Sequence, residues 1–179
     1  MDQPRQKRII SIGTLKKEKG FNVLIDAIKL LKESARLNGH SLTIVGAGPL
    51  EDQLKDQVRR LNLANEVEFV GHKRREEVVG ILNSAEIFVL SSISEGVPKV
   101  LLEAIACGVK IVSSRVGSVS KILGEDYALL CSPNDSEDLA SKIAICSSDR
   151  TNEFKIDSTR FSWKRVSESY ENVYDAMLG

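Results

Sequence analysis

Two kinds of segment alternate along the chain when its positions are sorted into apolar and polar. Six short, mainly apolar runs of four or five residues have the length and composition of buried β-strands. Longer segments separate them, and their apolar residues recur every three or four positions, which predicts amphipathic helices. The predicted strands are 8–12, 41–45, 67–70, 87–90, 110–113 and 128–131. The predicted helices are 21–37, 50–61, 76–84, 98–107, one that begins at 136, and a last one at about 163–178.

The regular alternation of strand and helix defines the expected fold class. Strands that are apolar on both faces belong to a parallel sheet covered by helices on both sides. Right-handed crossovers make this a doubly wound, Rossmann-like α/β sheet of about six strands, ordered 3-2-1-4-5-6. We expect a single domain over residues 8–179, preceded by a disordered or linker N-terminus at 1–7.

Composition narrows the possible functions. The chain has 179 residues, 25 basic and 25 acidic, so its formal net charge is zero. A nucleic-acid partner is not expected, because binding a polyanion needs a basic face. Three cysteines without C-x-x-C spacing and two histidines without H-x-x-x-H spacing indicate neither a disulfide framework nor a metal site. The polar, basic N-terminus MDQPRQKR resembles neither a signal peptide nor a membrane span.

In doubly wound sheets a ligand lies beyond the carboxyl ends of the strands, at the switch point between strands one and four. The loop after strand one, residues 13–20, carries Gly13 for a tight turn and then Lys16, Lys17 and Lys19. Lysine ammonium groups suit phosphate oxygens, although a solvated charged turn has the same pattern. The loop contains neither G-x-G-x-x-G nor G-x-x-x-x-G-K-[ST], so a nicotinamide fingerprint and a P-loop are not indicated.

The loop after strand four leads into a segment with two acids among apolar residues. Residues 94–104 read SEGVPKVLLEA, with Glu95 before a helix start near Pro98 and Glu103 inside the helix. Free amides at a helix start bind anions, so we expect a diphosphate between this helix start and Lys19. Glu103 would then hold a ribose, as the acidic residue of dinucleotide folds does. Ordinary helix acids and the acid and base of a hydrolase are the alternatives. The apolar neighbours of Glu103 argue against the first, and the spacing of two helical turns argues against the second.

Four stretches of the sequence carry motifs of one known family, in that family's order. The stretch SEGVPKVLLEAIACGVKIVSS resembles the E-x7-E signature region of the family 4 retaining glycosyltransferases. ISIGTLKKEKGFNVLIDAIKLLK is similar to the family's G-R-L-x-x-x-K-G segment, and LTIVGAGPLEDQLKDQVRRLNLANEVEFVGH to its V-G-x-G-P-L and V-x-F-x-G segments. FSWKRVSESYENVY resembles the usual ending, a helix that contains Trp. The resemblance covers about residues 8–176.

The resemblance implies a donor site. Members have the GT-B architecture of two Rossmann-like domains, in which the C-terminal domain binds the nucleotide-sugar donor and the N-terminal domain mostly binds the acceptor. This sequence matches the C-terminal half only. By motif position Lys19 would bind the diphosphate, Glu95 the transferred sugar and Glu103 the ribose, with Glu95 and Lys19 as the catalytic residues. The other expected donor-binding residues are Gly13, Thr14, Gly71, His72, Gly96, Val97 and Lys99.

The implied reaction is retaining transfer of a hexose or N-acetylhexosamine from a nucleoside diphosphate, UDP by default, to a glycan or lipid-linked acceptor. No cofactor or metal is expected. The missing N-terminal domain would bind the acceptor, in cis or in trans, and the isolated half would be inactive. A non-catalytic or split-subunit nucleotide-sugar-binding module is the alternative. The expected location is the cytoplasm, peripheral to a membrane through the missing domain.

Three positions depart from the family's common pattern. Thr14 stands where relatives often have arginine, which removes a phosphate contact unless Lys16 or Lys17 replaces it. Pro98 has no amide to donate to an anion. Lys121 reverses the charge of the acid that is usual in the turn after strand five.

Overall fold

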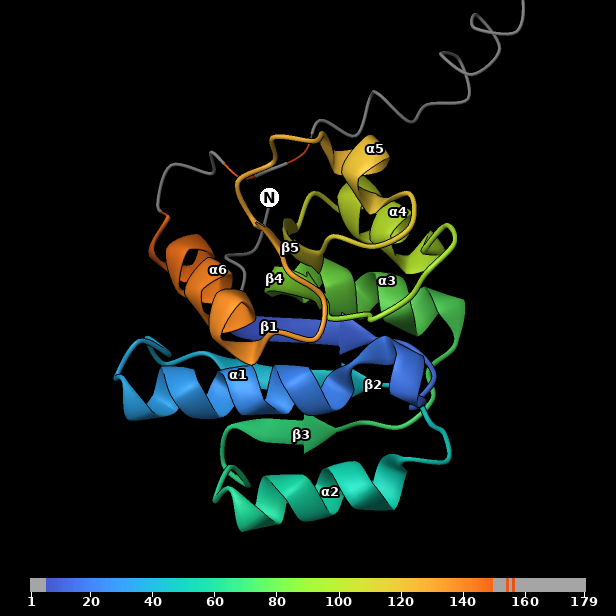
Figure 1. Ribbon diagram of the computed structural model, residues 1–179. Coiled ribbons are helices and arrows are strands. Elements are labelled where there is room, and N and C mark those ends of the chain that lie inside the picture. Colours follow the sequence, from blue (N-terminus) through green and yellow to red (C-terminus); the bar gives the residue numbers. More distant parts are fainter. Residues whose placement is uncertain (1–5, 150–153, 155, 157–179) are drawn as a thin grey trace, which may run out of the picture.

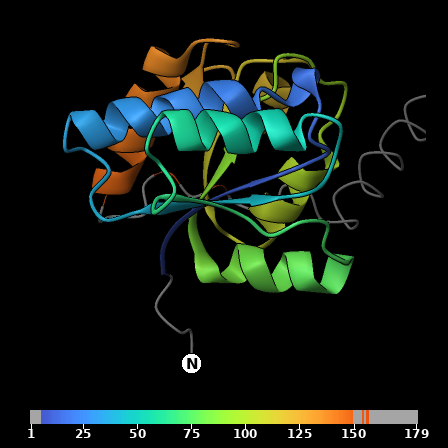
Figure 2. The same cartoon turned by 90° about the horizontal axis from the view of Figure 1, so that it is seen from below.

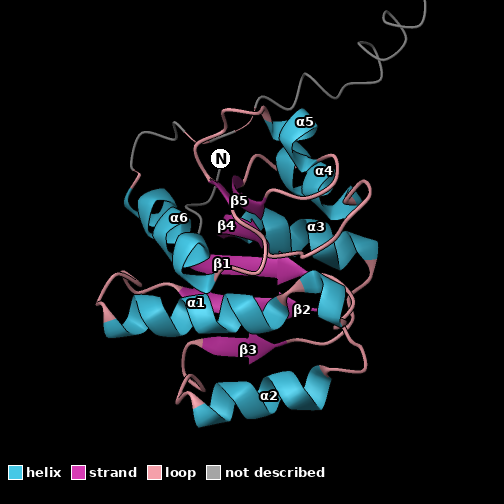
Figure 3. Ribbon diagram, in the orientation of Figure 1, coloured by secondary structure: helices cyan, strands magenta, loops and turns pink. Residues whose placement is uncertain are grey.

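The computed structural model of the chain describes residues 6–149, 154 and 156. Six parallel strands form one sheet. They are β1 (Gln6–Ile12), β2 (Ser41–Val45), β3 (Val67–Phe69), β4 (Ala85–Leu90), β5 (Lys110–Ser114) and β6 (Leu130–Cys131). Their order in the sheet is β3-β2-β1-β4-β5-β6, of which β1 to β5 are labelled in Figures 1 and 3. This arrangement confirms the expected doubly wound α/β fold. Its switch point lies between β1 and β4, which are neighbours in the sheet although other elements separate them in the chain.

The element bounds follow the apolar pattern closely. The helices are α1 (Phe21–Glu33), α2 (Glu51–Arg60), α3 (Arg75–Ser84), α4 (Lys99–Ala106), α5 (Val119–Leu123) and α6 (Ser136–Ser148), with a 3₁₀ turn η1 (Lys17–Lys19).

Helices cover both faces of the sheet (Figure 2). The core on one face includes residues of α1, α2 and α6, and the core on the other includes residues of α3, α4 and α5. Ile9 belongs to the first core and Ile10 to the second, because successive side chains of a strand point to opposite faces. Both are fully buried, which explains why the strands are continuously apolar.

Some predicted bounds were wrong, and two elements were not predicted. β1 begins at Gln6, two residues before the predicted strand 8–12, and α1 ends at Glu33 rather than at 37. The chain leaves the helical conformation there, since Ala35 and Asn38 both have positive φ. The short elements η1 and α5 were not predicted, because each is too short to show a period. The helix predicted at 163–178, with the FSWKRVSESYENVY motif, lies outside the described residues.

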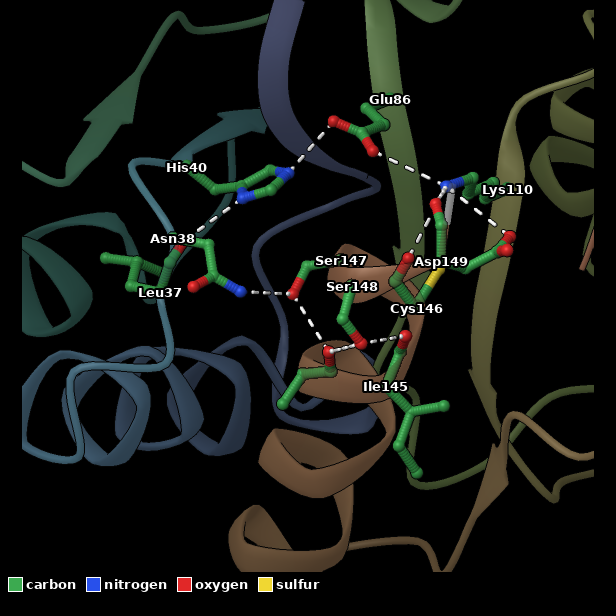
Figure 4. A network of polar contacts seen from close by, with 11 residues as sticks. Leu37, Asn38, His40, Glu86, Lys110, Ile145, Cys146, Ser147, Ser148 and Asp149 are labelled. Atoms are coloured by element: carbon green, nitrogen blue, oxygen red, sulfur yellow. Dashed lines mark hydrogen bonds and ion pairs between the residues drawn. The ribbon is translucent and has the colours of Figure 1, made fainter. Parts of the chain in front are cut away.

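A largely buried network of polar and charged side chains (Figure 4) lies at the amino ends of the strands. It is opposite the edge where a ligand is expected. Lys110 begins β5, and its Nζ donates to the backbone oxygen of Asp149 at 2.5 Å. The carboxylates of Glu86 and Asp149 each lie 3.5 Å from the same ammonium group. The other carboxylate oxygen of Glu86 lies 3.0 Å from Nε2 of His40. The network therefore joins the starts of β2, β4 and β5 to the end of α6.

Candidate functional site

Lys19 and Glu95 lie in direct contact although 76 positions separate them. The Nζ of Lys19 donates to Oε1 of Glu95 at 2.5 Å, and the Oγ of Ser92 donates to the same oxygen at 2.7 Å. The Glu95 side chain is only 10% exposed. The two loops follow β1 and β4, so this contact lies at the switch point where the sequence predicted a ligand.

The backbone of Lys19 is held by the loop after β4. The Oγ of Ser91 donates to the Lys19 carbonyl oxygen at 2.9 Å. The next residue, Gly20, has a φ of 61°, and a β-carbon there would lie 2.1 Å from the Ser91 carbonyl oxygen. Only glycine fits this close approach. Lys19 thus occupies a fixed position, whereas Lys16 and Lys17 are exposed and fit the solvated turn that the sequence left open.

The loop that carries Glu95 is supported by the turn after β5. The carbonyl oxygen of Gly96 accepts from both the amide (3.1 Å) and the Oγ (2.8 Å) of Ser118. A β-carbon on Gly117 would lie 2.1 Å from the Glu95 carbonyl oxygen, so this turn lies directly against the loop. Beyond the loop, Pro98 is the N-cap residue of α4, and no side chain caps it. The uncapped first turn of α4 has the character of an anion site.

Glu103 is partly exposed, whereas the sequence argument expected it to be buried. The buried residues of α4 are Leu101, Ala104 and Ile105, whereas Glu103 lies beside this apolar face with 32% of its side chain exposed. Its apolar sequence neighbours lie on another face because of the helical period. The Oε1 of Glu103 lies 3.7 Å from the Nε of Arg75, the first residue of α3.

A cavity of about 300 Å³ opens beside the ends of β1 and β2. Gly13, Thr14 and His72 contribute to its lining, so three of the predicted donor-binding residues meet there. Gly71, which was also predicted, lies next to this cavity and is fixed by its carbonyl oxygen, which accepts from the amide of Gly46 at 2.9 Å.

Neither a metal cluster nor a membrane helix occurs in the described residues. Across 6–149, 154 and 156, no three His, Cys, Asp or Glu side chains are grouped so that they could hold a metal ion. No described helix has the length and apolar character needed to cross a membrane.

The structure divides the predicted site residues into three places. Lys19 and Glu95 are in contact, and Gly13, Thr14, Gly71 and His72 lie in or beside the cavity. Gly96, Val97 and Lys99 form the exposed turn before α4 and its first residue. Glu103 contacts Arg75 instead of either member of the Lys19–Glu95 pair. Their roles toward a donor stay predictions.

Several residues that shape the site were missed by sequence reasoning. They include Gly46, Arg75, Ser91, Ser92, Gly117 and Ser118. The sequence held a signal for some of them, because glycines and serines follow strands two, four and five at the same edge of the sheet. Arg75 had no such signal, since it lies in the basic run KRR, which reads as a solvated surface.

The fold and the position of the site define the class: a Rossmann-like domain that corresponds to half of a GT-B fold. Anabaena HepE, solved in complex with UDP and glucose, has a TM-score of 0.76 and 21% identity, covering 96% of this chain and 49% of that chain. The catalytic domain of cholesterol-alpha-glucosyltransferase from Helicobacter pylori has a TM-score of 0.68 and 27% identity, covering 78% of this chain and 84% of that chain.

The sequence identifies the family within this class. The family described as "Glycosyl transferases group 1" matches residues 2–161, so the chain belongs to the group 1 glycosyl transferases. Amylovoran biosynthesis glycosyltransferase AmsK of Erwinia amylovora is 34% identical over 141 residues, which are 75% of this chain and 34% of that protein. Putative colanic acid biosynthesis glycosyltransferase WcaL of Escherichia coli K12 is 33% identical over 152 residues, 81% of this chain and 37% of that protein. The chain thus spans about a third of the length of these curated relatives.

Proposed function

We propose that this chain is the donor-binding half of a retaining glycosyltransferase, corresponding to the C-terminal domain of a family 4 enzyme. The donor is a nucleoside diphosphate sugar, bound across the carboxyl edge of the sheet. The observation that carries the proposal is the Lys19–Glu95 contact at the switch point. It places a cation for a diphosphate directly beside a carboxylate for sugar hydroxyls.

Lys19 and Glu95 bind different parts of the donor. In the free chain Lys19 and Glu95 neutralise each other at 2.5 Å. A diphosphate carries more negative charge than one carboxylate, so it competes for the Lys19 ammonium. Glu95 keeps the hydroxyl of Ser92 as a donor and becomes available to accept from sugar hydroxyls. The pair is therefore a preformed site. When the donor binds, Lys19 contacts the diphosphate and Glu95 contacts the sugar.

The remaining predicted residues are consistent with one position of the bound nucleotide along α4 and the cavity. The uncapped start of α4, with Gly96, Val97 and Lys99, faces a diphosphate with amides and the positive end of the helix dipole. Glu103 lies further along the same helix, where it accepts from the ribose hydroxyls. The cavity beside Gly13 and Thr14 holds the base, against the loop of Gly71 and His72.

The reaction breaks the bond between the anomeric carbon and the diphosphate, and forms a bond from that carbon to an acceptor hydroxyl oxygen on the same face. The diphosphate leaves with the electron pair, and the acceptor proton passes to it. Lys19 and the start of α4 stabilise the negative charge that develops on the leaving group, and each such donor lowers the barrier by about 3 kcal/mol. This assignment uses no metal ion.

The comparisons support a donor and an acceptor class. The structure of similar fold from Anabaena contains UDP and glucose, which favours a UDP-hexose or UDP-N-acetylhexosamine. The relatives named for amylovoran and colanic acid biosynthesis favour a glycan or lipid-linked acceptor. We assign the reaction to the cytoplasm. The acceptor-binding half would hold the enzyme at the cytoplasmic face of a membrane.

Calorimetric titration of UDP into the chain tests the donor site. Lys19→Ala removes a charge-assisted contact and should weaken binding about 10- to 100-fold. Lys17→Ala is the matched control, because Lys17 is an exposed lysine of the same loop, and it should leave the affinity unchanged. Equal affinities for wild type and Lys19→Ala would falsify the assigned diphosphate site.

A nucleotide-sugar-binding module without its own transferase activity is the second candidate. Supplying an acceptor-binding half from a relative and assaying transfer separates the two. Transfer only in the combined sample supports a half-enzyme that is completed in trans. Binding without transfer in both samples supports the module.

A further inference from the structure

Arg75 and Glu103 form an ion pair between two helices that border the candidate site. The Nε of Arg75 lies 3.7 Å from Oε1 of Glu103. Arg75 is the first residue of α3, and Glu103 lies in the second turn of α4. Within the described part of the chain, neither residue forms a second ion pair. The contact therefore ties the proposed ribose carboxylate to the element that follows the proposed base loop.

Glu103 pairs across the fold although a cation is available on its own helix. Lys99 precedes Glu103 by four positions, but a cation placed before an acid is the weaker orientation of a helical pair. The structure joins Glu103 to Arg75 instead. A contact between elements fixes the carboxylate relative to α3, which a contact within α4 would not do.

The pair leaves groups on both residues available to a nucleotide. Arg75 approaches Oε1, so Oε2 of Glu103 remains for a ribose hydroxyl, and a carboxylate has about four acceptor positions. The Arg75 side chain is 81% exposed. It comes three residues after His72 and two after Lys73, which both line the cavity proposed for the base.

We propose that Arg75 is a positioning residue that fixes the Glu103 carboxylate for the hydroxyls of the nucleotide ribose. This rests on the proposed function, in which Glu103 holds the ribose. A glutamate side chain otherwise samples several rotamers, and binding must select one of them. The ion pair makes that selection before the ligand arrives. Because an exposed pair contributes little to folding, its effect falls on ribose recognition.

Titration with UDP and with 2′-deoxy-UDP tests the role of Arg75. The wild type should prefer UDP by about tenfold, since a hydroxyl that donates to a carboxylate is a charge-assisted contact. Arg75→Ala should reduce this preference to about threefold, because it weakens the binding of UDP and not that of 2′-deoxy-UDP. Arg75→Lys retains a cation and should keep most of the preference. A residue with only a structural role would weaken both nucleotides together.

Arg74→Ala is the matched control. Arg74 adjoins Arg75 and is equally exposed, but its side chain lies 3.4 Å from Glu77 and its amide donates to the same carboxylate. That backbone hydrogen bond holds the pKa of Glu77 below its ordinary value. The variant should leave both nucleotide affinities unchanged. Raising the salt to about 0.5 M should bring the wild-type preference towards that of Arg75→Ala, because the pair is exposed and is screened.

The outcomes separate this inference from the proposed function. If Arg75→Ala keeps the wild-type preference, or weakens both nucleotides equally, while Glu103→Gln loses the preference, the positioning role is overturned and the donor site stands. If Glu103→Gln also keeps the preference, the ribose role of Glu103 fails and the inference fails with it. If the wild type does not bind UDP, the proposed function itself fails.

Discussion

Gly46 lies against Gly13 so closely that a β-carbon on Gly46 would be 1.9 Å from the carbonyl oxygen of Gly13. Gly46 also has a φ of 140°, which L side chains rarely adopt. The amide of Gly13 in turn donates to the carbonyl oxygen of Val45 at 3.0 Å. Gly46 itself lines the cavity proposed for the base, so that cavity depends on a glycine in the loop that follows β2.

Gly46→Ala should destabilise the fold and disrupt the cavity. Backbone strain and overpacking together should lower the free energy of unfolding by about 2–4 kcal/mol, measured by urea denaturation. Gly80→Ala is the control, because Gly80 lies in α3 and a β-carbon added to it would have nothing within 4 Å. It should raise the free energy of unfolding by about 0.5–1 kcal/mol. Similar midpoints for the two variants would contradict the close approach.

Gly117→Ala should damage nucleotide-sugar binding more than it damages folding. The new β-carbon would push on the carbonyl oxygens of Glu95 and Gly96, and so displace the loop that carries the proposed sugar carboxylate. We expect affinity for a UDP-sugar to fall by about tenfold. Gly124→Ala provides the control, because Gly124 also has a positive φ (109°) but nothing within 4 Å. That variant should lose stability through strain and keep its affinity. An equal loss of affinity in both would show that strain alone is responsible.

The sequence predicted what depends on local pattern and missed what depends on distant contacts. The six strands and their order follow from apolar runs and crossover handedness, and the structure confirms both. Lys19 and Glu95 could be placed at one edge because parallel strands end together. The pairing of Glu103 with Arg75 could not be predicted, since no local rule links α3 to α4. The sequence predicted Lys110 only as the first residue of the fifth strand, because its burial depends on partners 24 and 39 residues away.

Lys110→Met should destabilise the fold strongly. The Lys110 side chain is 5% exposed, and its ammonium group lies between the carboxylates of Glu86 and Asp149. The Asp149 side chain is as deeply buried. Removing the cation leaves buried negative charge without its counter-ion, which costs about 3–5 kcal/mol. Lys142→Met is the control, because the Nζ of Lys142 donates to the Ala128 carbonyl oxygen at an exposed position. It should change the free energy of unfolding by less than about 0.5 kcal/mol. Urea denaturation of both variants would measure the difference, and a small effect of Lys110→Met would contradict the network.

Stability should fall at alkaline pH because of two buried thiols. Burial raises the pKa of the Cys131 and Cys146 thiols from the ordinary value of 9.0 to about 12. The folded-state pKa lies above the unfolded one, so the stabilisation is complete below about pH 9 and is lost as the pH rises towards 12. At pH 10 each thiol should lower the free energy of unfolding by about 1.4 kcal/mol, because only the unfolded chain ionises there.

Urea denaturation at pH 8 and pH 10 measures this loss against variants that lack the thiols. The doubly substituted Cys131→Ala, Cys146→Ala chain will be less stable at both pH values, since each alanine leaves space in the core. Between pH 8 and pH 10, the free energy of unfolding of this variant should fall by about 2.8 kcal/mol less than that of the wild type. Each single variant should recover about half of that amount. An unchanged difference in the double variant would mean that other groups govern the alkaline transition, among them Tyr127, whose pKa burial also raises.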